Sequence, residues 1–305
     1  MKAVITYEEV LALDASGKKI SKEMAQAINV LGYNYDYGRS HLKRDRPKAV
    51  ELYQIAAKHG NHNAEYNLGM AYDFGYGVEI DYVKAVYWYR RAAEHGIAEA
   101  MTNLASFYHR GIVVELDDKQ SVYWLKRAVK KGDTLAMSVL SDRYYWGDGV
   151  RKNLPMCIRL LKRSAEAGEA RAQYDLSWHY CKGIGVEQSD EMENYWLLKA
   201  AAQGDDYALN SLGYNYLNGI YVEKDSAMAV QYFLKAVKKK NEEAANNLAI
   251  CYEDGDGVEK NLREALRWYR LADKWCKEGM EEEIARVKEL IKAEEAEKKA
   301  GGNCV

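Results

Sequence analysis

Small, large apolar and aromatic residues recur along this chain in a pattern that is typical of helices. From residue 64 onward, an alanine, a leucine and a tyrosine follow one another in steps of four, and the group occurs six times, once every 36 residues. Steps of four place the three side chains on one face of a helix, so each copy predicts a helix, called helix A, that buries this stripe. The alanines are Ala64, Ala100, Ala136, Ala172, Ala208 and Ala244, the leucines Leu68, Leu104, Leu140, Leu176, Leu212 and Leu248, and the tyrosines Tyr72, Tyr108, Tyr144, Tyr180, Tyr216 and Tyr252.

The residues after each stripe predict a helix end and a new helix start. A glycine stands three residues after each tyrosine, where a left-handed backbone closes a helix. Six residues further on is a side chain that can accept hydrogen bonds from the free N–H groups of a second helix, helix B. The glycines are Gly75, Gly111, Gly147, Gly183, Gly219 and Gly255, and the predicted caps are Asp81, Asp117, Asn153, Ser189, Asp225 and Asn261.

Helix B has its own stripe, in which a large residue is followed four places later by a small one. The large residues are Trp88, Trp124, Leu160, Trp196, Tyr232 and Trp268, and the small ones Ala92, Ala128, Ser164, Ala200, Ala236 and Ala272. A weaker first copy is visible once a slip of one residue is allowed, because Leu31, Tyr35 and Gly38 match the leucine, tyrosine and glycine columns. The array is therefore expected to begin near Ser21.

These columns resemble the Sel-one-like repeat family. Residues 64–96 read AEYNLGMAYDFGYGVEIDYVKAVYWYRRAAEHG, which contains the family's Leu-Gly, Gly-x-Gly-Val, Trp-Tyr and Ala-Ala-x-x-Gly elements. The resemblance covers roughly residues 25–275. Tetratricopeptide units are similar but run 34 residues and carry a proline near their end, and no copy here has a proline there.

The predicted fold is all-α: a right-handed α/α superhelical solenoid of about seven helix-turn-helix repeats of 36 residues plus a C-terminal capping helix. We expect an N-terminal segment at 1–20, a solenoid at 21–275 and a charged capping helix and tail at 276–305. The expected repeats are about 21–60, 61–96, 97–132, 133–168, 169–204, 205–240 and 241–275. Met280, Ile284, Val287 and Ile291 give the last helix an apolar stripe that would cover the open end of the array, and a partner-binding helix is the alternative.

Composition excludes several function classes. Forty-four Lys and Arg balance 46 Asp and Glu, so no positive excess exists to bind nucleic acid. Glu8 and Glu9 interrupt what would be the apolar part of a signal peptide, and no apolar run is long enough to span a bilayer. The five cysteines follow neither a disulfide nor a metal-ligand spacing. A soluble protein of the reducing cytoplasm, without membrane insertion, is predicted.

The candidate binding surface is the groove that the A helices of such a solenoid line. Positions three, six and ten after each alanine point away from the buried stripe and vary between copies, as a specific partner surface requires. Outward aromatic residues suit an apolar partner, and asparagines suit the backbone of an extended peptide. The partner-binding candidates are Tyr33, Tyr37, Asn67, Met70, Phe74, Asn103, Arg110, Asp142, Trp146, Asp175, Trp178, Lys182, Tyr214, Asn218 and Asn247.

No catalytic, metal or cofactor site is predicted. His59 and His62 are three residues apart but flank the turn at Gly60, and no zinc-ligand motif is present. Some cysteine-rich members of the family are linked to penicillin binding and beta-lactamase activity. Ser16 and Lys19 match their Ser-x-x-Lys motif, but no Lys-Thr-Gly follows.

The function indicated by the residues and the resemblance together is a non-enzymatic scaffold or adaptor that binds a peptide or protein partner in the groove. Family roles in signalling, protein quality control or host–microbe contact are equally open, as is the oligomeric state. Two alternatives are a hydrolase related to the cysteine-rich members and a purely structural oligomer.

Overall fold

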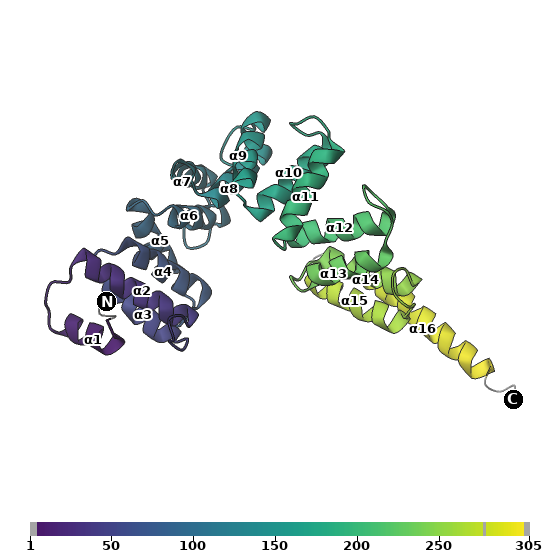
Figure 1. Ribbon diagram of the computed structural model, residues 1–305, viewed down its shortest axis with the longest axis horizontal. Helices are drawn as coiled ribbons and strands as arrows, with labels where there is room; N and C mark the ends of the chain where they lie inside the picture. The colour runs from purple at the N-terminus through teal and green to yellow at the C-terminus, as the bar shows by residue number, and fades with distance from the viewer. Residues whose placement is uncertain (1–4, 277–278, 302–305) are drawn as a thin grey trace. The chain divides into compact units, whose positions relative to one another are not determined.

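Helices are the main secondary structure of the chain. The computed structural model describes residues 5–276 and 279–301, with side chains described to residue 297. This part contains sixteen helices and no strand (Figure 1). They are α1 (Tyr7–Ala15), α2 (Lys22–Tyr37), α3 (Arg46–Lys58), α4 (His62–Phe74), α5 (Tyr82–Glu94), α6 (Ala98–Arg110), α7 (Asp118–Lys130), α8 (Thr134–Trp146), α9 (Leu154–Glu166), α10 (Ala170–Lys182), α11 (Asp190–Ala202), α12 (Asp206–Asn218), α13 (Ser226–Val237), α14 (Glu242–Asp254), α15 (Leu262–Trp275) and α16 (Glu281–Gly301). The all-α prediction is confirmed.

Seven helix pairs form the repeats. The A helices are α2, α4, α6, α8, α10, α12 and α14, and the helix after each is its B helix. An A helix packs on the B helix that follows it, as α4 does on α5, and a B helix packs on the next A helix, as α5 does on α6. Neighbouring pairs therefore bury one another's apolar faces, and the predicted repeat architecture is confirmed.

The chain divides into two compact units, with the division between Leu160 and Leu161 inside α9. The core of the first unit contains the alanine and leucine columns of α4, α6 and α8, among them Leu68 and Leu104 with no exposed surface. The core of the second unit contains the same columns in α10, α12 and α14. Each unit is held together by the same repeated packing.

The predicted turn chemistry is present. Gly75 ends α4 in a left-handed conformation (φ 70°), and Asp81 accepts a hydrogen bond from the backbone N–H of Lys84 at the start of α5. The N–H of Asp81 also donates to the backbone carbonyl of Tyr72, 2.9 Å away, and the equivalent bond occurs in every repeat. In the first repeat, the loop from Gly38 to Asp45 is one residue longer than the loop from Gly75 to Asp81, which accounts for the slip in the sequence.

Two columns differ from the sequence-based expectation. The tyrosines at the end of each A helix are half-buried rather than buried. In four of them the ring faces a cation, as Tyr72 does with Lys84 Nζ 5.1 Å from its ring centroid. The deepest large side chains of the B helices stand one residue after the tryptophan column. They are Tyr89, Leu125, Leu161, Leu197, Phe233 and Tyr269, none more than 2% exposed.

Additional helices cover both ends of the array. Helix α1 packs on α3 and buries Val10 completely. Helix α16 packs on α15, with Val287 fully buried and Ile284 and Ile291 beside it (Figure 1). The predicted capping helix is therefore α16. In residues 5–276 and 279–301, none of the helices has the length and apolarity that crossing a bilayer requires.

Candidate functional site

The fifteen candidate residues are all at least partly accessible. Nine are exposed: Tyr37, Phe74, Arg110, Asp142, Trp146, Trp178, Lys182, Tyr214 and Asn218. Six are half-buried: Tyr33, Asn67, Met70, Asn103, Asp175 and Asn247. Met70 packs against the core of the first unit, where its sulfur accepts a hydrogen bond from the Tyr89 hydroxyl at 3.2 Å.

The two outward tryptophans belong to different units. Trp146 is 62% exposed on α8 in the first unit, and its ring stands edge-on to Tyr145. Trp178 is 37% exposed on α10 in the second unit and stands edge-on to His179. Each tryptophan is therefore considered separately, as a candidate partner-binding residue of its own unit.

The second unit contains a cavity of about 1090 Å³ along three of its A helices, α10, α12 and α14. Two of the candidates, Tyr214 and Asn247, come together there. The full lining is Cys181, Glu193, Asn210, Ser211, Tyr214, Asn215, Ile220, Tyr221, Glu242, Glu243, Asn246, Asn247, Trp275, Cys276 and Met280. A volume of this size accommodates several side chains of a partner.

The charge of this cavity is negative. Glu193, Glu242 and Glu243 line it, and its described lining includes no lysine, arginine or histidine. Within the described residues, none of the three carboxylates forms an ion pair with a cation of this chain. Concave surfaces lined by one sign of charge concentrate the field and attract groups of the opposite sign. The cavity is thus suited to a cationic group.

A chain of side-chain amides connects the repeats at this cavity. Asn247 Nδ2 on α14 donates to Asn210 Oδ1 on α12 at 2.9 Å, and Asn210 Nδ2 donates to Glu243 Oε2 at 3.1 Å. Asn210 is buried, so it supports neighbouring helices instead of contacting a partner. The same bond joins Asn67 to Asn29 in the first unit, at 3.0 Å. Asn67 and Asn247 therefore have a structural role that the sequence did not indicate, and Asn247 also lines the cavity.

Tyr221 is unusual among the lining residues. It adopts a left-handed backbone (φ 58°) at a place where four other repeats have glycine and one has Val113. A non-glycine residue costs roughly 1–2 kcal/mol in this conformation. The Tyr221 hydroxyl contacts Glu193 Oε2 at 3.0 Å and Asp190 Oδ1 at 3.2 Å, and its partial burial together with these carboxylates raises the pKa of the phenol. Tyr221 therefore stays protonated and orients Glu193 at the edge of the cavity.

Sequence reasoning missed the acidic residues and Tyr221, although signals for both exist. Glu243 directly precedes Ala244, which puts it on the same helical face as the chosen columns at about 100° per residue. Tyr221 interrupts a glycine column. Trp275 and Cys276 follow the last repeat and carry no comparable signal.

Ser16, the serine of the Ser-x-x-Lys match, lies in a turn. Ser16 follows the end of α1, and its hydroxyl donates to the backbone carbonyl of Leu13 at 2.7 Å. A local bond of this kind terminates a helix. The Ser-x-x-Lys match is thus accounted for by a turn.

Comparison with protein families gives a match to the Sel1 repeat model in seven consecutive copies. They cover residues 25–61, 62–97, 98–133, 134–169, 170–205, 206–241 and 242–272. Among curated proteins, no sequence matches the chain significantly.

Solved structures with the same fold include two close to this chain. One is a protective antigen present in uropathogenic Escherichia coli strains that displays an SLR fold, with 32% identity over 88% of this chain and a TM-score of 0.66; this chain spans 56% of its length. A Sel1 repeat protein from Oxalobacter formigenes shares 28% identity over 87% of this chain and 76% of its own, with a TM-score of 0.67. An immunity protein from Pseudomonas aeruginosa, 20% identical over 71% of this chain and 82% of its own, shares the fold with a TM-score of 0.52.

Proposed function

The chain belongs to the Sel1 repeat family, whose helical repeats are generally protein-interaction scaffolds. On this premise we propose that the chain is a non-enzymatic adaptor. It binds a basic peptide segment in the acidic cavity of its second unit. The partner is a protein that presents a lysine or arginine beside an apolar residue in an extended segment.

The observation that carries the proposal is the set of three carboxylates without a cation. Glu193, Glu242 and Glu243 face one cavity and have no ion-pair partner in the described chain. A lysine or arginine from another protein would neutralise them, and charged hydrogen bonds of this kind are stronger than neutral ones. Attraction over several ångströms would also speed association at low salt.

The rest of the lining suits the other parts of a peptide. Tyr214, Ile220, Trp275 and Met280 provide aromatic and apolar surface for the side chain next to the cation. Aromatic residues at the centre of a contact usually contribute most of its binding energy. Asn247 also lines the cavity, and its Oδ1 can accept a hydrogen bond from a peptide N–H. The cavity thus offers charge, apolar surface and backbone recognition together.

Chemistry in the cavity argues for binding and not for catalysis. A nucleophilic cysteine requires a lowered pKa, usually from a nearby cation or histidine. Burial, and then the charge of Glu193, instead raises the pKa of the Cys181 thiol. The described lining has no histidine that could act as a base. We therefore propose an adaptor instead of a hydrolase.

The first unit has a smaller cavity of its own. Asn103 lines a cavity of about 360 Å³ with Tyr66 and Glu99, on the corresponding face of its A helices. Phe74, 52% exposed, provides apolar surface on the neighbouring A helix α4. We propose that both take part in protein recognition by this unit.

Peptide selection tests the proposal. Short random peptides displayed on phage are selected against the full chain, and the enriched peptides are synthesised and titrated by fluorescence anisotropy. Enrichment of lysine or arginine next to an apolar residue is expected. The triple variant Glu193→Gln/Glu242→Gln/Glu243→Gln should weaken binding at least about thirtyfold, equivalent to about 2 kcal/mol.

The matched control removes the same charge elsewhere. Glu166, Glu191 and Glu259 are exposed and lie outside the cavity, so their triple Gln variant should bind peptides as the unmodified chain does. Equal weakening by both triple variants, or enrichment of peptides without basic residues, would contradict the proposal. Cys276 provides a second readout, because bound peptide should slow its alkylation.

A further inference from the structure

One charged side chain is buried where the repeat otherwise places uncharged residues. Glu65 on α4 has no exposed surface. The equivalent positions of the other repeats hold Met101, Met137, Gln173, Leu209 and Ala245, all buried. Burying a carboxylate costs free energy unless charged or hydrogen-bonding partners surround it. The fold does not require a glutamate here, so its surroundings explain its presence.

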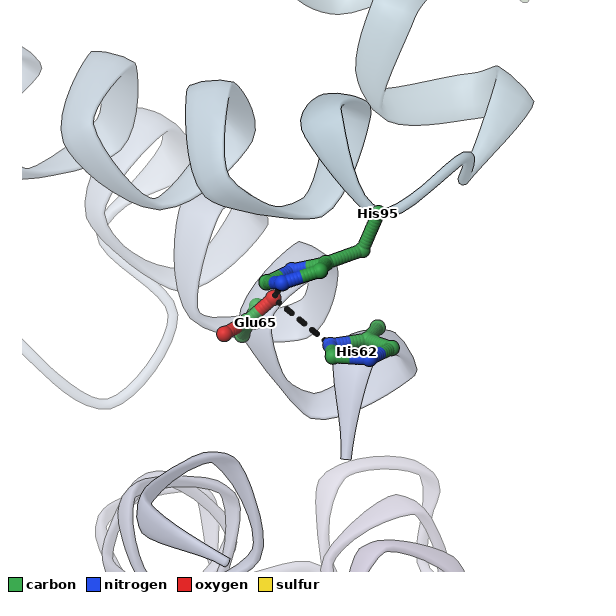
Figure 2. A group of neighbouring side chains, drawn as sticks. All are labelled: His62, Glu65 and His95. Carbon is green, nitrogen blue, oxygen red and sulfur yellow. Dashed lines mark hydrogen bonds and ion pairs between the residues drawn. The ribbon is translucent and has the colours of Figure 1, made fainter. Parts of the chain in front are cut away.

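Three nitrogen-bearing side chains meet this carboxylate. His62 Nδ1, in the first turn of α4, lies 3.2 Å from Glu65 Oε2, and His95 Nδ1, at the C-terminal end of α5, lies 2.9 Å from the same oxygen. Arg91 Nη2 is 2.8 Å from the other oxygen, Oε1. Figure 2 shows His62 and His95 near the same end of the Glu65 side chain, where both imidazoles contact one carboxylate oxygen, Oε2.

We propose that His62, Glu65 and His95 form a binding site for a divalent transition metal, with zinc(II) as the ion whose ligand preference fits them. Two imidazoles and one carboxylate are an established zinc donor set, which leaves a fourth position for water. In a tetrahedral zinc site with bonds of about 2.0–2.1 Å, neighbouring ligand atoms are about 3.3 Å apart. The ligand atoms here all lie within 4.8 Å of one another.

The accessibility of the three residues suits an ion that arrives from solution. The side chains of His62 and His95 are 40% and 42% exposed, whereas Glu65 is buried beneath them. The two rings stack at a centroid distance of 3.7 Å and an angle of 17°. Because a metal lies in the plane of the imidazole that binds it, the rings turn apart when the ion enters. Exposed side chains have room for this rotation.

Arg91 occupies a position that supports the site. Its guanidinium nitrogen Nη2 pairs with Oε1 at 2.8 Å, so Oε2 remains for the metal. A carboxylate held by a second partner in this way is oriented for the ion. The bound metal would then connect the start of α4 to the end of α5.

The second unit contains the same arrangement without the metal-binding chemistry. Three repeats further on, the positions of His62, Glu65 and His95 are held by Ala170, Gln173 and Gln203. Gln203 Nε2 donates to Gln173 Oε1 at 2.9 Å. A hydrogen bond between two neutral amides is therefore enough for the helices to pack at these positions. Packing alone does not explain why the first unit has two histidines and a buried glutamate there.

Titration of the full chain with zinc chloride after chelator treatment tests the site. Isothermal titration calorimetry should show that one zinc ion binds per chain. The variants His95→Gln and His62→Ala should each weaken the affinity for this zinc ion at least about thirtyfold. The triple variant His62→Ala/Glu65→Gln/His95→Gln introduces the residue types found at positions 170, 173 and 203. It should have a normal circular dichroism spectrum and should not bind this zinc ion. His41→Ala, an exposed histidine outside the cluster, is the matched control and should leave the zinc affinity unchanged.

Cobalt(II) distinguishes the cluster from the cysteines. Cobalt bound to His62, Glu65 and His95 should give the visible bands of a tetrahedral nitrogen and oxygen site without the intense near-ultraviolet band of a cobalt–thiolate bond. Zinc should also raise the melting temperature of the unmodified chain and not that of the triple variant. The proposal is overturned if the unmodified chain binds no zinc, or if the triple variant still binds this zinc ion.

Discussion

Gly69 on α4 lies against the ring of Tyr89 on α5 so closely that a Cβ atom on the glycine would be 2.5 Å from Cδ1 of the ring. The same relationship recurs in the second unit, where a Cβ on Gly213 would be 2.5 Å from Cε1 of Phe233. Where the B helix has a leucine, as at Leu125, the A helix has a slightly larger residue, Ala105. At Gly69 and Gly213 the missing side chain thus leaves room for the ring of the B helix, whereas the last repeat places Ala249 with Tyr269.

Replacing Gly69 with alanine should destabilise the first unit by about 1–3 kcal/mol. The added methyl group overlaps a fully buried ring, and this outweighs the roughly 1 kcal/mol by which alanine favours a helix. The double variant Gly69→Ala/Tyr89→Leu reproduces the Ala105/Leu125 pair and should recover most of the loss. Urea unfolding followed by circular dichroism measures both, and a stable Gly69→Ala variant would show that the ring moves freely.

Truncation of the leucine column should cost about 2–5 kcal/mol per site. Leu140 is 3% exposed and Leu176 is fully buried, one in each unit. Because repeats contact only their neighbours, the loss should appear as partial unfolding of the affected unit. Leu135→Ala is the control, since Leu135 is 50% exposed and should change stability by less than about 0.5 kcal/mol. Similar unfolding curves for all three variants would contradict the core assignment.

Val113 and Tyr221 replace glycine at a position with a left-handed backbone, and replacing each of them with glycine should have a different effect. Val113 (φ 67°) and Tyr221 (φ 58°) both sit in the left-handed region. Val113→Gly should stabilise the chain by about 0.5–1 kcal/mol, because relief of strain exceeds the entropy of a freer unfolded chain. Tyr221→Gly should gain less, since it also loses two hydrogen bonds, and it should weaken peptide binding. Thermal melts and anisotropy titrations check the pair; unchanged peptide affinity in Tyr221→Gly would remove Tyr221 from the site.

Thiol reactivity should follow burial. Cys157 and Cys251 are each 1% exposed, whereas Cys181 and Cys276 are half-buried, and none of the four forms a disulfide bond. Native alkylation should modify Cys276 and Cys181 first and leave the other two, while denaturation without reductant should release five thiols. Cys304 lies outside the described residues. Mass spectrometry after timed alkylation measures the order, and a disulfide in fresh protein would oppose the proposed cytoplasmic location.

Stability should fall at alkaline pH in a way that depends on Cys251. Burial raises the pKa of this thiol to about 11, compared with about 8.5 for an unfolded cysteine. The unfolded state therefore loses its proton first, and stability decreases as pH rises through the interval between the two values. Between pH 8 and 9.5 the loss attributable to Cys251 should be about 1 kcal/mol. Denaturation curves of the unmodified chain and of Cys251→Ala, measured at both pH values, give the free energies of unfolding. Only the unmodified chain should lose this part of its free energy of unfolding.

The sequence by itself determined the repeat, its helix pairs and their ends, because these depend on residues that are close along the chain. Asp81 caps α5 through an N–H three residues away, and Gly75 ends α4 by its own conformation. The alanine and leucine stripes are likewise properties of a single helix. Repetition then showed which columns the fold requires, since they recur in every copy.

Only the tertiary structure decided which outward residues come together. Glu193, Tyr221 and Glu243 share a cavity although they come from three different segments, and Asn210 turned inward to bond with Asn247. His62 lies beside His95, 33 positions later, and not with His59, which instead contacts Asp14. Local periodicity tells which face of a helix is buried. The distance between side chains on different helices depends on how the helices pack, as the close contact between Gly69 and the ring of Tyr89 shows.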